Sequence, residues 1–267
     1  MSDPEGRPDA VDAARAMFFT FLAIGAMWGI AALAGGAPRE VLSLAMQAAF
    51  FAGPLLYARA VKLRPFKSSG YATLGPTQIA LILVASLGSM WLLQGLTLVQ
   101  EPVLDWLGLR KVVTGEKNQL TQNLKEAQEK GFAWEALLLV VASPVCEETF
   151  FRGLALRGFA RRLGALPALI LTSFFFAAMH QTLVQFALMF VLGFYFGTLI
   201  WLTRSLWAGM IAHALNNSAV VILTAKFGPK IEALRAPWWM YALSAIVFVG
   251  AIAILALERR KRAPISP

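Results

Sequence analysis

The chain is poor in charged residues and in cysteine, and each shortage excludes a class of protein. Only 15% of its 267 residues are charged, whereas about 25% are charged in a typical soluble domain. The single cysteine, Cys146, excludes an intramolecular disulfide framework. Hydrophobic residues make up 58% of the chain. These proportions indicate an integral membrane protein that is surrounded by a lipid bilayer.

Basic residues outnumber acidic ones and give a net charge of +9, yet this charge is not arranged for binding nucleic acid. Lysine and arginine cluster at the ends of apolar segments, as they do in membrane proteins with basic cytoplasmic loops. We therefore expect no nucleic-acid partner. The more basic side carries both ends of the chain, so we expect both termini to be cytoplasmic, in a bacterial-type inner (plasma) membrane.

Long apolar segments recur along the whole chain. A segment crosses the roughly 30 Å hydrocarbon core with about 20 residues, at about 1.5 Å per residue. Segments of suitable length and composition lie at residues 17–36, 41–61, 77–99, 133–156, 166–183, 185–203, 205–224 and 237–257. They predict an all-α polytopic membrane protein with about eight transmembrane helices around an intramembrane cavity.

Three polar stretches flank or interrupt these segments. We expect residues 1–15 to form a disordered cytoplasmic tail, residues 16–258 one integral membrane domain, and residues 259–267 a basic cytoplasmic tail. Residues 100–132 form a hydrophilic insert, which this topology places on the extracytoplasmic side. Helical spacing of apolar residues in its second half, with Gly131 as a C-cap, predicts a surface helix outside the membrane.

Three ionisable residues lie within one of the apolar segments. A charged side chain at the bilayer centre costs about 2.5–3.5 kcal/mol, so intramembrane charges are candidate functional groups. Glu148 and Arg152 are four residues apart and share a helix face, which favours an ion pair. Glu147 lies about 100° around the helix and remains free to act as a general base. Pro144 is expected to kink the helix beside these acids.

The chain has two histidines, His180 and His213, and both lie in predicted membrane segments. Counted from the basic cytoplasmic loops, they and Glu147 lie at depths of roughly 12 to 21 Å. We therefore expect all three side chains to meet in one cavity in the cytoplasmic half of the membrane. Asn217 follows His213 by four residues and shares its helix face.

These residues form three motifs, in this order along the chain: Glu147-Glu148-x-x-x-Arg152, Phe176-x-x-x-His180 and His213-x-x-x-Asn217. Their ordered combination resembles the CAAX prenyl protease type 2 and bacteriocin-processing family of intramembrane proteases, also called CPBP or Abi proteases. The resemblance covers residues 134–220. It implies an integral membrane protease domain that cleaves a membrane-associated protein or peptide. Eukaryotic relatives process prenylated C-terminal tails, but nothing in this chain identifies a prenyl substrate or an oligomeric state.

The resemblance implies three tasks for the motif residues: activation of water by Glu147 with His180, orientation by the pair of Glu148 and Arg152, and stabilisation of the oxyanion by His213 and Asn217. The chemistry agrees. Peptide hydrolysis needs a base for water, a proton donor for the leaving amine and donors aimed at the developing oxyanion. Glutamate, histidine and asparagine side chains supply these functions.

A zinc site is the alternative to metal-free catalysis. Glu147, His180 and His213 would supply three ligands and water a fourth. The HExxH helix of zinc proteases is absent from the sequence, and a zinc ligand at Glu147 would remove the glutamate that is needed as base. We therefore favour catalysis without a metal cofactor.

The alternative functions belong to other classes of protein. One is a non-catalytic membrane scaffold or immunity protein, and another is a proton-coupled transporter that uses the buried acids as a relay. Transporters often carry inverted repeats with broken helices in both halves, and the sequence shows none.

Overall fold

The computed structural model describes residues 8–36, 38–62, 70–130, 136–228, 230 and 235–261. Within these ranges the chain is nearly all helical and has no strand, apart from one isolated bridge between Tyr71 and Ser205. The predicted all-α class is confirmed.

Six described helices are long and apolar enough to cross a membrane. They are α1 (Ala10–Leu33), α2 (Arg39–Ala60), α4 (Pro76–Trp106), α10 (Leu183–Thr203), α11 (Leu206–Phe227) and α12 (Trp238–Lys261). A shorter apolar helix, α9 (Ala165–Ala178), precedes α10. The protein is therefore a polytopic helical membrane protein, as its hydropathy predicts.

The described part of the predicted span at 133–156 is a helix of mixed type. It consists of the π-helix η1 (Leu137–Ala142), α7 (Ser143–Glu148), a second π-helix η2 (Thr149–Leu156) and α8 (Arg157–Leu163). Pro144 lies in the first turn of α7, which follows η1 without a break, and it has no N–H to donate to the carbonyl oxygens of η1. We expected a kink at this proline; next to it, the structure shows a change from π-helix to α-helix. Short π-helical stretches are frequent at functional sites.

Several boundaries differ from those that the sequence predicts. Helix α1 begins at Ala10, inside the predicted tail 1–15, because Asp9 and Asp12 form a capping box at its start. Residues 1–7 lie outside the described residues, as do 262–267 and Gly131. The hydrophilic insert 100–132 is mostly helical, because α4 continues to Trp106 and α5 (Arg110–Lys130) follows after a short turn.

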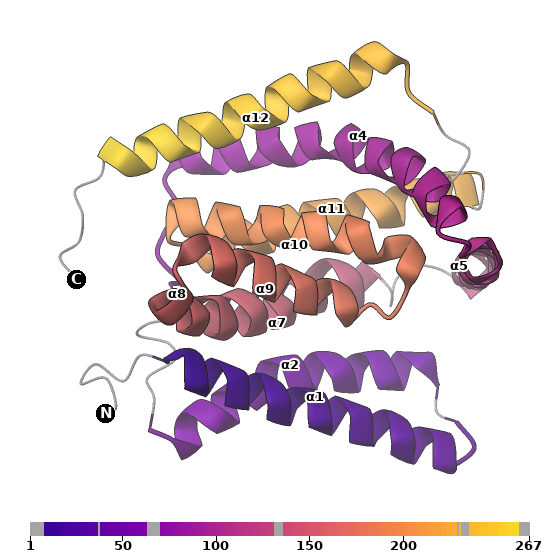
Figure 1. The fold of residues 1–267 in the computed structure, drawn as a ribbon, viewed down its shortest axis with the longest axis horizontal. Coiled ribbons are helices and arrows are strands. Elements are labelled where there is room, and N and C mark those ends of the chain that lie inside the picture. Colours follow the sequence, from indigo (N-terminus) through magenta and orange to yellow (C-terminus); the bar gives the residue numbers. More distant parts are fainter. Residues whose placement is uncertain are drawn as a thin grey trace.

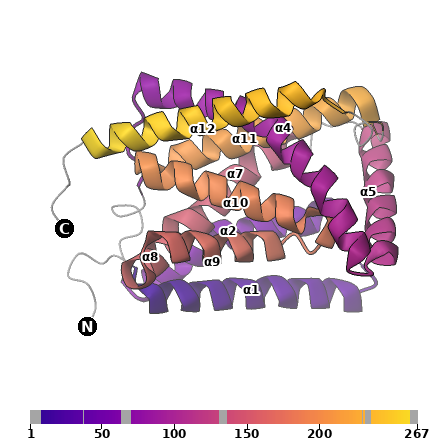
Figure 2. The same ribbon diagram turned by 45° about the horizontal axis from the view of Figure 1, so that its top comes forward.

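The helices form a layered bundle with α5 across one end. In Figure 1, α12 and α4 lie on one side, α9, α10 and α11 in the middle, and the hairpin of α1 and α2 on the other side. The start of α1 and the end of α12 lie at the same end of the bundle. Figure 2 shows α5 at the opposite end, crossing the other helices. The hydrophilic insert and the two outer helix ends therefore lie at opposite ends of the molecule.

Candidate active site

The predicted ion pair lies in the centre of the bundle. Arg152 and Glu148 are both fully buried, and Nη1 of Arg152 donates to Oε1 of Glu148 at 3.0 Å. The guanidinium also donates through Nη2 to the carbonyl oxygen of Gly193, at 2.7 Å. A Cβ at position 193 would lie 3.1 Å from Nη2, so the glycine allows this approach. The centre of the Phe176 ring lies 4.6 Å from the guanidinium carbon. The guanidinium therefore contacts a carboxylate, a carbonyl oxygen and an aromatic ring.

His213 joins this pair from α11. Its Nδ1 lies 3.1 Å from Oε1 of Glu148, the oxygen that also accepts from Arg152. An ionised carboxylate can only accept, so Nδ1 carries the proton and donates. The imidazole stacks on Phe196 at a centroid distance of 4.8 Å and an interplanar angle of 16°. These contacts hold the ring in one orientation and leave Nε2 as its second functional atom.

Glu147 is held by two donors from different helices. Its Oε1 accepts from Nε2 of Gln47, at 2.8 Å, and from Oγ of Ser143, at 2.6 Å. Both donors use the same oxygen, and among the described residues none donates to Oε2. The side chain is 7% exposed. Glu147 is therefore oriented through one oxygen, while the other is free for chemistry.

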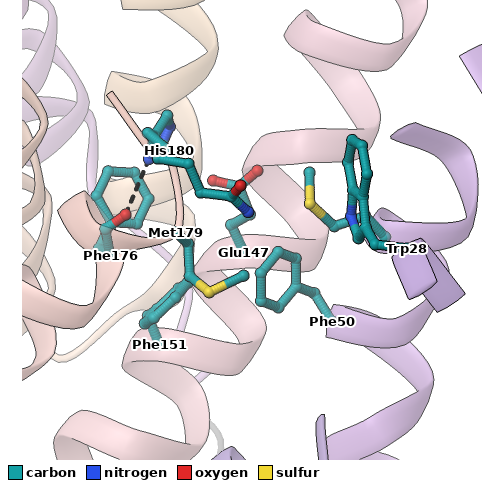
Figure 3. Close-up of a pocket in the computed structure, with 9 residues that line it drawn as sticks. Trp28, Phe50, Glu147, Phe151, Phe176, Met179 and His180 are labelled. Atoms are coloured by element: carbon teal, nitrogen blue, oxygen red, sulfur yellow. Dashed lines mark hydrogen bonds between the residues drawn. The ribbon is translucent and has the colours of Figure 1, made fainter. Parts of the chain in front are cut away.

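A pocket of about 280 Å³ surrounds Glu147. It is mostly apolar and is lined by Trp28, Met46, Phe50, Glu147, Phe151, Phe176, Met179, His180 and Gln181. Figure 3 shows Glu147 between Trp28 and Phe50 on one side and His180 and Phe176 on the other. The pocket thus combines one carboxylate, one imidazole and an apolar wall, as ligand-binding pockets commonly do.

His180 lies in the turn after α9, outside the helix in which we predicted it. Helix α9 ends at Ala178, five residues before the predicted end of this span, and His180 is exposed. Its Nδ1 lies 2.8 Å from the carbonyl oxygen of Phe176. A carbonyl only accepts, so Nδ1 carries the proton and Nε2 of the neutral ring is an acceptor. Figure 3 shows this hydrogen bond beside Glu147.

The pocket lies toward α5, and this position conflicts with one of our two expectations on topology. Helix α9 has only 14 residues. His180, about fourteen residues from the loop that precedes α9, therefore lies at the far end of this helix. There, Thr182 contacts Glu116 of α5. The turn after α9, which contributes His180 and Gln181 to the pocket, thus lies toward the end opposite the outer ends of α1 and α12. Cytoplasmic termini and a cavity in the cytoplasmic half cannot both be correct.

Asn217 contacts another part of the motif-bearing helix. Its Nδ2 donates to the carbonyl oxygen of Leu139, at 2.7 Å, and neither Asn217 nor His213 lines the pocket around Glu147. The structure therefore brings together Glu147 with His180, and separately His213 with the buried ion pair.

No group of three or more histidine, cysteine, aspartate or glutamate side chains that could hold a metal ion is found in the described part of the chain. The candidate zinc ligands Glu147, His180 and His213 are thus not assembled as one ligand set in this structure.

Two polar residues at the site were not predicted as site residues. Ser143 precedes Glu147 by four residues, so helical periodicity would have placed it on the same face. Gln47 is 100 residues from Glu147 along the chain, and no local pattern marks it. The only feature of the sequence that could have indicated Gln47 as a site residue is that it is a polar residue within an apolar predicted span.

Part of the chain matches a known protein family. Residues 129–219 match the family described as type II CAAX prenyl endopeptidase Rce1-like. This segment contains all three motifs and confirms the family resemblance that they indicate. Gln47 and Glu116 lie outside it. No curated protein and no solved structure matches the chain.

Proposed function

We propose that this protein is an intramembrane endopeptidase that hydrolyses a peptide bond in a membrane-associated protein or peptide. The observation that carries the proposal is the shared pocket of Glu147 and His180, in which Glu147 is held through Oε1 alone. The match of the motif-bearing segment to a family of CAAX endopeptidases supports the same class of reaction.

Hydrolysis proceeds by general base catalysis at Glu147. Oε2 removes a proton from a water molecule that also donates a hydrogen bond to Nε2 of His180, and the water oxygen bonds to the carbonyl carbon of the substrate. The tetrahedral intermediate then collapses. The proton held by Glu147 passes to the leaving amine nitrogen as the C–N bond breaks, and the carboxylate is restored.

Oxyanion stabilisation falls to His213 and Asn217. One N–H of the Asn217 amide bonds to Leu139, and the second is available as a donor. His213 donates through Nδ1 to Glu148, so donation through Nε2 requires both ring nitrogens to be protonated. The single Glu148 carboxylate then faces two cations, Arg152 and His213, and the excess positive charge favours a negatively charged oxyanion. Neither residue lines the pocket around Glu147, so this role requires the substrate carbonyl to extend from the pocket toward α11.

We favour a reaction without bound metal, because a glutamate that is a zinc ligand cannot also serve as the free base. Elemental analysis of the purified active protein, with assays in a strong chelator, tests this choice. We expect activity to persist in the chelator. Stoichiometric zinc, with activity that is lost on chelation and restored by zinc, would make Glu147, His180 and His213 ligands instead.

The peptidase activity itself is tested with protein reconstituted in lipid vesicles. The probe is a farnesylated peptide that ends in a CAAX sequence, and the same peptide without the lipid is the control. Proteomic comparison of cells carrying the native chain or Glu147→Gln covers substrates of other kinds. We expect a cleavage product that is absent with Glu147→Gln. If cells that express Glu147→Gln at a normal level have the same phenotype as cells with the native chain, the scaffold or immunity function would be favoured.

A further inference from the structure

The turn between α9 and α10 carries His180 and depends on side chains from elsewhere in the chain. Gln181 has a φ of +53°, a left-handed backbone conformation that residues other than glycine rarely adopt. The next residue, Thr182, is the N-cap of α10, but its hydroxyl makes no capping bond within its own helix. This turn therefore requires external support.

Glu116 of α5 supplies the missing cap. Its carboxylate accepts from the hydroxyl of Thr182 at 2.6 Å and from the backbone N–H groups of Leu183 at 3.1 Å and Val184 at 2.9 Å. The first N–H groups of a helix have no partner within the helix, and a carboxylate at this end also interacts favourably with the helix dipole. One side chain of the hydrophilic insert thus satisfies the start of α10.

Helix α4 holds the start of α10 through Gln100. Its Nε2 donates to the carbonyl oxygens of Leu183 and Val184, at 3.0 and 2.8 Å. An ion pair between Lys117 and Glu101 joins α5 to α4. In a membrane, backbone at the end of a helix is tolerated where protein groups satisfy it, and here α4 and α5 do so together.

We infer that Glu116 is a positioning residue for His180. The His180 ring is oriented by its bond to Phe176 on one side and by the backbone of the turn on the other. Release of the α10 cap lets the turn relax from the left-handed conformation at Gln181 and moves Nε2 of His180 relative to Glu147. The inference rests on the proposed function for its catalytic consequence, but the effect on His180 is independent of it.

The two histidines of the chain make this inference directly testable. Protein labelled with ¹³C at histidine Cε1 should give two side-chain NMR signals in detergent, which His180→Gln assigns. We expect Glu116→Ala to shift the His180 signal and leave the His213 signal in place. Glu116→Gln keeps an acceptor for the N–H groups and should restore most of the native signal. Glu129→Ala is the control, because Glu129 is an exposed acid on the same helix.

In the peptidase assay with the farnesylated probe, Glu116→Ala should lower kcat by roughly 10- to 100-fold with little change in KM, since a displacement near 1 Å can cost that much. An unchanged His180 signal in Glu116→Ala, or an equal change in Glu129→Ala, would overturn the inference. If the alanine variant does not fold, Glu116→Gln carries the test. A native His180 signal in this variant, together with a fall in kcat and a rise in KM by the same factor, would also overturn the inference. A native protein without peptidase activity would contradict the proposed function alone, because the NMR signals still report on the turn.

Discussion

The side-chain amide of Asn217 donates a hydrogen bond to the backbone carbonyl oxygen of Leu139, at 2.7 Å. Within η1 the N–H of Ser143 bonds to the carbonyl oxygen of Leu138. In this π-helical pattern the next carbonyl, that of Leu139, would accept from residue 144, which is a proline and has no N–H. Asn217 therefore supplies the donor that Pro144 lacks, and it ties α11 to the helix that bears Glu147.

Asn217→Ala should show two separable effects. Loss of the bond to Leu139 should lower the free energy of unfolding by about 0.5–1.5 kcal/mol, and loss of an oxyanion donor should lower kcat by roughly 10²- to 10³-fold. Adding Pro144→Ala provides a backbone N–H for Leu139. The double variant should regain thermal stability but remain slow. Recovery of activity together with stability would assign Asn217 to the helix alone.

Removal of Arg152 should act first on folding. Arg152→Ala leaves Glu148 fully buried beside His213 without its cation, and breaking a buried pair costs about 3–5 kcal/mol. We expect less folded protein and a lower Tm, measured by detergent gel filtration and thermal unfolding. Arg162→Ala removes an exposed arginine of α8 and should leave both measurements unchanged. A fully stable but inactive Arg152→Ala protein would contradict a structural role.

Gln47→Leu tests how Glu147 is oriented. Leucine is similar in size but removes one of the two donors to Oε1, and a hydrogen bond to a charged group contributes about 1.5–3 kcal/mol. We expect kcat to fall by roughly ten- to a hundredfold, while Glu147→Gln abolishes turnover. The combination of Gln47→Leu and Ser143→Ala should be slower than either single variant. Full activity in the double variant would show that Glu147 needs neither donor.

The capping bond of Glu116 should make stability depend on pH. Burial raises the pKa of Glu116, but hydrogen bonds from the Thr182 hydroxyl and the backbone N–H groups of Val184 and Leu183 outweigh it, so the pKa lies below its ordinary value of 4.5. Because its pKa is lowered in the fold, ionised Glu116 stabilises the folded state fully above pH 4.5. This stabilisation is lost as the pH falls through the pKa of Glu116 in the folded state.

Thermal unfolding from about pH 6 to about pH 3 measures this effect. The native chain should lose more stability on acidification than Glu116→Gln, which cannot titrate. Glu129→Gln should behave like the native chain, because its side chain is exposed. Equal acid sensitivity of the native chain and Glu116→Gln would refute the capping contribution.

Cysteine labelling decides between the two topological expectations. In a Cys146→Ala background, Lys125→Cys places a thiol at an exposed position of α5, and Arg162→Cys places one at an exposed position of α8, near the opposite end. With cytoplasmic termini, an impermeant reagent should label position 125 in intact bacterial host cells and position 162 only in inverted vesicles. The reverse pattern would place the pocket on the cytoplasmic side and both termini outside.

The sequence by itself determined those features that depend on residues close together in the chain. Hydropathy over about 20 residues is enough to predict the spans, because each must bury its own backbone in lipid. The ion pair of Glu148 and Arg152 follows from helical periodicity. The order of the three motifs was likewise sufficient to indicate the family.

Only the tertiary structure decided which distant groups meet. Gln47 reaches Glu147 across 100 residues, and Glu116 caps α10 from another helix; neither contact has a local pattern, because both depend on how separate helices pack. The depth of His180 depended on where α9 ends, and hydropathy continues past that point into α10. The position of the pocket at the α5 end therefore depends on how the helices pack, which only the tertiary structure shows.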